Sequence, residues 1–250
     1  MKKVVIDPGH APDNANCDPL GYFEYAGMWK LSNFLNERLE AHGINVQLTR
    51  TEHEDPSLGA MGSAARGADL FISQHSNAFN GIVQGSECLY SVTQPESRSI
   101  AARFSAKTAA FFNHRDRGAK TNDSFGVIRA AVAAGCPRVF FMESGFHDNW
   151  EDETILLQNE NLRHIADIHA NIILDELGVN NQSAPVPSDT LNNGDIQLPA
   201  GHVPSGWAQE AWEWAFSNGV TDGTNPQNPA TREQMMQLLW NFSRRFIQPQ

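Results

Sequence analysis

Short runs of β-branched and aromatic residues alternate with amphipathic segments along the first 178 residues of this 250-residue chain. Such runs are typical of buried strands, and the longer segments between them carry apolar residues with a helical period. Strands that alternate with helices predict an α/β fold with a mostly parallel sheet flanked by helices. The predicted strands are 4–6, 44–48, 69–73 and 138–142, and the predicted helices are 25–42, 97–113 and 149–177.

A break in composition follows residue 178. Residues 179–201 contain three prolines, many Asn and Ser residues, and no aromatic or basic residue. Such a segment buries too little apolar surface to offset the entropy of ordering it, so we expect a flexible linker. Residues 202–250 are predicted to form a small helical module of two amphipathic helices around a turn. Because a module of this size is marginally stable alone, we expect it to dock or to self-associate.

Composition and charge exclude several classes of function. The chain has 18 basic and 29 acidic residues, a formal net charge of −11, and no basic run, which argues against nucleic acid or an anionic membrane as a partner. No stretch approaches eighteen consecutive apolar residues, so no membrane insertion is expected. The apolar run after Lys2 and Lys3 ends at Asp7, so we expect no signal peptide. The three cysteines form no CxxC pair, which argues against a thiolate zinc site.

Polar side chains stand after three of the predicted strands: His10, His75 and Glu143. Parallel strands place such residues at one edge of the sheet, and Glu24, at the start of the first long helix, can fold over the same edge. Two imidazoles and one carboxylate with an open fourth position are typical of catalytic zinc. The remaining carboxylate would then transfer a proton from water to a leaving amine. Six of the other seven histidines are interpreted as structural: His42, His53, His114, His147, His164 and His202.

The order of five motifs adds a resemblance to this interpretation. They are 5–10 (VIDPGH), Glu24, Thr49-Arg50, 68–78 (ADLFISQHSNA) and 141–149 (FMESGFHDN). Together they resemble the zinc-dependent N-acetylmuramoyl-L-alanine amidases of bacterial autolysins and phage endolysins over residues 2–178. The resemblance implies a six-stranded sheet in a catalytic domain at 1–178, which cleaves peptidoglycan between N-acetylmuramic acid and L-alanine. It also implies that His10, Glu24 and His75 bind Zn²⁺ and that Glu143 is the catalytic carboxylate.

The C-terminal module at 202–250 resembles a single S-layer-homology motif. That family anchors proteins to cell-wall polysaccharide and normally assembles three motifs, so one motif implies a homo-oligomer or a divergent use. Trp212 is then a candidate for stacking on a sugar, and Arg232 for a basic residue of the ligand pocket. An equal alternative is that the tryptophans of this module are core or dimer contacts.

Two alternatives to the amidase stay open at this point. Another zinc peptidase, such as a carboxypeptidase, would typically place its first His and Glu in an HxxE arrangement, which His10 and Glu24 do not show. A non-catalytic cell-wall-binding protein would not need all four polar residues. The expected absence of an export signal favours a phage or prophage endolysin, made in the host cytoplasm and acting at the wall after release.

Overall fold

The structure is a computed structural model of the chain, and it describes residues 1–12, 20–179 and 214–215. The chain divides into two units, Met1–Ala184 and Pro185–Gln250, and each is considered by itself. Trp214 and Ala215 are helical. The predicted linker beyond residue 179, the rest of the predicted module at 202–250, and the candidates Trp212 and Arg232 lie outside the described residues.

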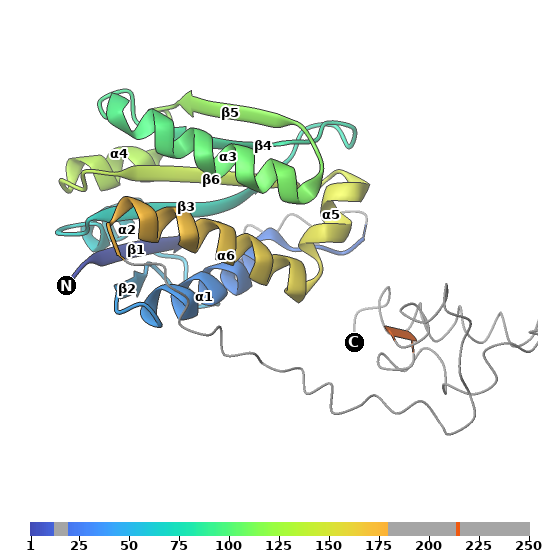
Figure 1. The fold of residues 1–250 in the computed structure, drawn as a ribbon, viewed down its shortest axis with the longest axis horizontal. Coiled ribbons are helices and arrows are strands. Elements are labelled where there is room, and N and C mark those ends of the chain that lie inside the picture. The colour runs from blue at the N-terminus through green and yellow to red at the C-terminus, as the bar shows by residue number, and fades with distance from the viewer. Residues whose placement is uncertain (13–19, 180–213, 216–250) are drawn as a thin grey trace, which may run out of the picture. The chain divides into compact units, whose positions relative to one another are not determined.

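A six-stranded sheet forms the centre of the first unit, with the strand order β2-β1-β3-β6-β4-β5 (Figure 1). All neighbouring strands pair in parallel except β4 and β6, which are antiparallel. The predicted mostly parallel, six-stranded α/β sheet is thereby confirmed. The strands are β1 (Lys3–Pro8), β2 (Asn45–Leu48), β3 (Leu70–Asn77), β4 (Ser86–Tyr90), β5 (Asp116–Thr121) and β6 (Val139–Phe146).

Helices cover both faces of this sheet. Three of them, α1 (Glu24–Glu40), α3 (Arg98–Phe112) and α6 (Asn159–Glu176), lie across the near face in Figure 1. The short helices α2 (Leu58–Ala64) and α4 (Gly126–Ala133) pack on the other face. The remaining elements are α5 (Trp150–Leu156), which follows β6, and a 3-10 turn at Pro95–Ser97.

The alternation of side chains along the strands explains the two layers. Val4 and Ile6 of β1 belong to the core with α1, α3 and α6, whereas Val5 between them belongs to the core with α2 and α4. Successive strand residues point to opposite faces, so a sheet buried on both sides needs unbroken apolar runs. None of the helices in the described part of the chain is long and apolar enough to span a bilayer.

Three details differ from the sequence predictions. The helix predicted at 149–177 is two helices, because the backbone becomes extended at Gln158 and the Asn149 side chain caps α5 separately. Strands β4 and β5 were not predicted from their residues: β5 contains no apolar run, and the short run of β4, Cys88-Leu89-Tyr90, was not assigned to a strand. His75 and Glu143 lie within β3 and β6 rather than after them, since both strands extend further than their apolar runs.

A fully buried histidine joins α6 to the sheet and to α3. Nδ1 of His169 lies 3.1 Å from Nε2 of Gln74, and its Nε2 lies 3.0 Å from Oγ1 of Thr108. Burial lowers the pKa of His169 to about 3. The imidazole is therefore neutral in the folded protein at any pH at which the protein works, whereas the unfolded chain takes up a proton below a pKa of about 6.5.

We predict that acid weakens the fold through His169. Below pH 6.5 the unfolded chain binds a proton at His169 that the folded protein does not. The free energy of unfolding therefore falls as the pH falls toward 3, by about 2 kcal/mol at pH 5. Urea unfolding between pH 7.5 and 4.5 measures this slope. His169→Gln, which keeps polar atoms but cannot titrate, should show a shallower slope than the wild type. Equal slopes for the two proteins would contradict the prediction.

Candidate metal centre

Three of the predicted site residues meet at the carboxyl ends of β1 and β3. His10 comes two residues after β1, Glu24 begins α1, and His75 lies near the end of β3. Nε2 of His10 is 3.1 Å from Oε2 of Glu24, and Nδ1 of His75 is 3.2 Å from Oε1 of Glu24. One ligand atom from each of the three side chains lies within 4.8 Å of the others. The residues predicted as metal ligands are therefore brought together.

Arg50 holds the loop that carries His10. Its buried guanidinium donates from Nε to the carbonyl oxygen of Pro8 at 2.9 Å and from Nη2 to that of Gly9 at 2.9 Å. Nη2 also donates to the carbonyl oxygen of Tyr25 in α1 at 3.0 Å. His10 has a φ of +55°, a left-handed conformation that is uncommon for any residue but glycine. The arginine thus stabilises a strained backbone that aims His10 at Glu24.

Gly9 is required by the close approach of β3. Its N–H donates to the carbonyl oxygen of Gln74 at 2.8 Å. A Cβ atom at this position would come within 2.6 Å of the same oxygen and of the ring of His75. Any larger residue would therefore displace a predicted ligand.

A chain of hydrogen bonds sets which ring nitrogen of His75 carries its proton. Ser73 donates its hydroxyl proton to Oδ2 of Asp7 at 2.5 Å, so its oxygen can only accept from Nε2 of His75, which lies 3.1 Å away. The proton of a neutral His75 is therefore on Nε2, and Nδ1 presents a lone pair. Stacking on the ring of Phe141, at 4.1 Å between centroids, fixes the ring plane.

The contact between His75 and Glu24 calls for a cation. Nδ1 of His75 and Oε1 of Glu24 both present lone pairs, at 3.2 Å from each other, and Oε1 already accepts from the backbone N–H of Ser76 at 2.8 Å. Two such acceptors repel unless a proton or a metal ion lies between them. Burial raises the pKa of Glu24, but a protonated His75 that donates from Nδ1, together with the charge of a protonated His10 and the N–H of Ser76, brings this pKa below its ordinary value, so positive charge at this position favours the ionised carboxylate. Two imidazoles and one carboxylate fit zinc.

Glu143 lines the same cleft, and one of its carboxylate oxygens makes no hydrogen bond to the described residues. It pairs with His75 in the register of β3 and β6, and the side chain is buried. Among the described residues, its Oε2 has no hydrogen-bond partner. Burial, together with the negative charges of Glu24 and Glu87, raises the pKa of Glu143 well above its ordinary value. A buried carboxyl group with a free oxygen is suited to proton transfer.

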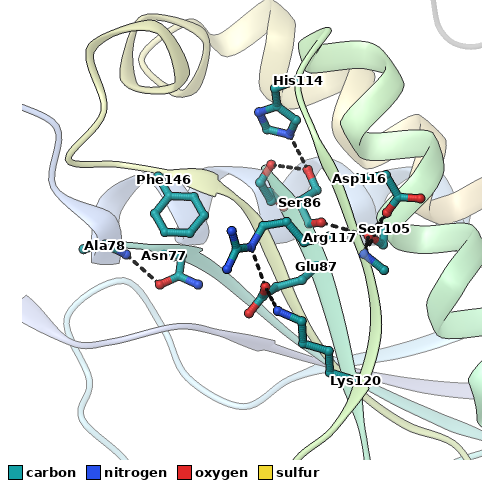
Figure 2. A network of polar contacts seen from close by, with 12 residues as sticks. Asn77, Ala78, Ser86, Glu87, Ser105, His114, Asp116, Arg117, Lys120 and Phe146 are labelled. Carbon is teal, nitrogen blue, oxygen red and sulfur yellow. Dashed lines mark hydrogen bonds and ion pairs between the residues drawn. The ribbon is translucent and has the colours of Figure 1, made fainter. Parts of the chain in front are cut away.

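An ion-pair network of Glu87, Arg117 and Lys120 lies on β4 and β5 (Figure 2). Glu87 of β4 is opposite Glu143, and its Oε2 accepts from Nε of Arg117 at 2.7 Å and from Nζ of Lys120. Burial raises the pKa of Glu87, but these two cations bring it below its ordinary value. The Arg117 guanidinium also lies 5.1 Å from the ring centre of Phe146. The sequence analysis missed this network, because it depends on β4 and β5.

The site opens into a cleft of about 390 Å³. His10, Glu24, His75 and Glu143 line it on the side of the sheet. The opposing wall is apolar and comes from α2 and the start of α4: Leu58, Met61, Phe125 and Val127. A polar floor and an apolar wall are typical of sites that bind small or extended organic ligands.

One histidine interpreted as structural lies at the site instead. His147 lines the cleft, is 2% exposed, and has its Nε2 at 3.5 Å from Oε2 of Glu24. The signal in the sequence is its position, since His147 directly follows β6, the strand that carries Glu143. His114 is structural as predicted: it lies 2.8 Å from Oγ of Ser86 and 2.9 Å from Oδ1 of Asp152.

Comparison with known proteins decides the family. The sequence profile of the N-acetylmuramoyl-L-alanine amidases matches residues 4–175. This chain belongs to that family. LytC, an N-acetylmuramoyl-L-alanine amidase of Bacillus subtilis strain 168, is 32% identical over 160 residues, which is 62% of this chain. The match covers 31% of LytC, so the chain spans about a third of that relative.

Solved structures of amidases share the fold of this family member. The catalytic domain of CwlV from Paenibacillus polymyxa is 24% identical with a TM-score of 0.64, and the match covers 72% of this chain and 100% of that domain. The amidase AmiC2 of Nostoc punctiforme is 26% identical with a TM-score of 0.62, covering 71% of this chain and 97% of AmiC2. The resemblance predicted from the sequence is confirmed for the family and for the fold.

We predict that Arg50→Lys weakens metal binding. Lysine keeps the charge, but its three N–H donors sit on one nitrogen and cannot replace the five hydrogen bonds that the Arg50 guanidinium makes to carbonyl oxygens, so the His10 loop loses support. Zinc affinity, measured by competition with a chromogenic chelator, should fall roughly tenfold. Arg163→Lys, on an exposed pair with Glu37, is the matched control and should bind zinc like the wild type. Unchanged affinity in Arg50→Lys would show that the loop holds itself.

Proposed function

We propose that this chain is a zinc-dependent N-acetylmuramoyl-L-alanine amidase that cleaves peptidoglycan between N-acetylmuramic acid and L-alanine. The observation that carries the proposal is the pair of facing acceptors, Nδ1 of His75 and Oε1 of Glu24, within reach of His10 and beside a free Glu143. Membership of the amidase family supports the same reaction. In this proposal His10, Glu24 and His75 hold the zinc ion.

The reaction needs help at both partners, because an amide is a poor electrophile and water a poor nucleophile. When bound, zinc supplies Lewis-acid polarisation of the amide carbonyl and lowers the pKa of water to about 7. Glu143 accepts a proton from the attacking water on its free oxygen and delivers it to the L-alanine nitrogen as the C–N bond breaks. The products are a free lactyl carboxylate on the sugar and a peptide with a free amino terminus.

The apolar wall of the cleft fits the groups that flank this bond. The lactyl group and L-alanine each carry a methyl group, and Leu58, Met61 and Val127 offer apolar contact. The same side chains keep bulk water away from Glu143, which strengthens the electrostatic interactions in the site.

The finer predictions concern the biological setting. The endolysin role, action at the wall after release from the host cytoplasm, and polysaccharide binding or self-association through the C-terminal module stay predictions. Trp212 and Arg232 carry the polysaccharide prediction, and wall binding by Trp212→Ala and Arg232→Ala tests it. A zinc peptidase acting on stem peptides is the second candidate function, since the proposed metal centre serves amide hydrolysis in general.

Digestion of purified peptidoglycan distinguishes the candidates. We expect new L-alanine amino termini without new reducing sugars, abolished by a chelator and restored by zinc. New amino termini elsewhere in the stem peptide would establish the peptidase instead. No cleavage of several wall types by a zinc-loaded protein would leave a cell-wall-binding protein on an amidase scaffold.

Glu143→Gln should separate proton transfer from metal binding. The amide keeps the shape of the side chain but cannot accept the proton, so turnover should fall roughly 10²–10⁴-fold while zinc remains bound. Glu160→Gln, at an exposed position on α6, is the control and should leave both unchanged. Near-full turnover in Glu143→Gln, with zinc content equal to the wild type, would remove Glu143 from the mechanism.

A further inference from the structure

The two carboxylate oxygens of Glu24 have separate sets of neighbours. Oε1 accepts from the backbone N–H of Ser76 at 2.8 Å and faces Nδ1 of His75 at 3.2 Å. Oε2 faces Nε2 of His10 at 3.1 Å and Nε2 of His147 at 3.5 Å. Each oxygen therefore has one neighbour among the proposed zinc ligands and one outside them.

A bound zinc ion would occupy the lone pairs of His10 and His75. It would leave the hydrogen-bonding groups of Ser76 and His147 unchanged. The nitrogens of His10 and His75 direct their lone pairs at the metal, so neither can hold Glu24 by donating a proton. Among the described residues, Ser76 and His147 then remain as the groups that restrain the carboxylate, one on each oxygen. Carboxylates that bind metals are themselves hydrogen-bonded, and those partners set their orientation.

The position of His147 is well determined by its surroundings. Its backbone N–H donates to the carbonyl oxygen of Asn77 at 2.8 Å, which ties it to the end of β3. The next residue, Asp148, accepts from the N–H groups of Phe79 and Gly81 at 2.9 Å, and the following residue, Asn149, caps α5. The imidazole is almost fully buried. These bonds hold the backbone at His147, and the ring, buried 6.1 Å from the ring centre of Tyr22, has little space to move away from Glu24.

We propose that His147 is a positioning residue that restrains Oε2 of Glu24 and thereby strengthens zinc binding. The proposal rests on the proposed metal centre of His10, Glu24 and His75. It assigns no contact between His147 and the metal, because the ligand atoms that lie within 4.8 Å of one another come from those three residues. The site of this chain thus uses a third histidine to hold the ligand rather than the ion.

Two substitutions at His147 test the proposal, with zinc affinity as the readout. His147→Leu removes the polar contact, and the zinc dissociation constant, measured by chelator competition, should rise roughly 10- to 100-fold. His147→Gln places an amide nitrogen near the position of Nε2 and should recover most of that loss. His164→Leu, at an exposed histidine on α6, controls for loss of an imidazole and should bind zinc like the wild type. Circular dichroism of each variant checks that it is folded.

The cobalt-substituted protein distinguishes positioning from coordination. The visible spectrum of Co²⁺ reports ligand number, and His147→Leu should keep the wild-type band shape and intensity. Equal zinc affinity in wild type, His147→Leu and His147→Gln would overturn the proposal, and so would a cobalt spectrum that shows a lost ligand. Absence of stoichiometric zinc in the wild type would instead overturn the proposed metal centre, and this inference with it.

Discussion

The hydrogen bond from Ser73 to Asp7 is the interaction on which the chemistry of this site depends. It uses the only proton of the serine, so His75 must donate from Nε2 and present a lone pair at Nδ1. That lone pair faces Glu24, and the repulsion between the two acceptors makes the position favourable for a cation. Adjacent parallel strands place Asp7 beside Ser73, so the register of β1 and β3 creates this arrangement.

The supports of the site come from segments far apart in the chain. Arg50, beyond β2, holds the His10 loop, Ser76 of β3 holds one oxygen of Glu24, and in our proposal His147 holds the other. In the described part of the chain, Oε2 of Glu143 receives no such support, and the negative charges of Glu24 and Glu87 raise the pKa of this carboxyl group. In our proposal the ligands are thus restrained while one oxygen of the proton carrier is left without a hydrogen bond, which suits a group that must gain and lose a proton.

Much of this arrangement could be predicted from the sequence, and the rest could not for physical reasons. The strands at 4–6, 69–73 and 138–142 were predicted because a sheet buried on both faces needs continuous apolar runs. β5, with the sequence DRGAKT, has no such run, so Arg117 and Lys120 could not be placed beside Glu87. The place of His147 at the site could not be predicted, because only the folded chain brings its side chain near Glu24.

The helices that cover the two faces of the sheet differ in length, and this difference affects how an insoluble substrate such as peptidoglycan could reach the cleft. One face carries the long helices α1, α3 and α6, whereas the face with the cleft carries α2 and α4, of seven and eight residues. Peptidoglycan is a cross-linked network, so its strands cannot be threaded through a tunnel or enclosed by a closing lid. A cleft bordered by two short helices can be pressed against such a network from outside. In the proposed function, the thinly covered face of the first unit is then the face that meets the wall.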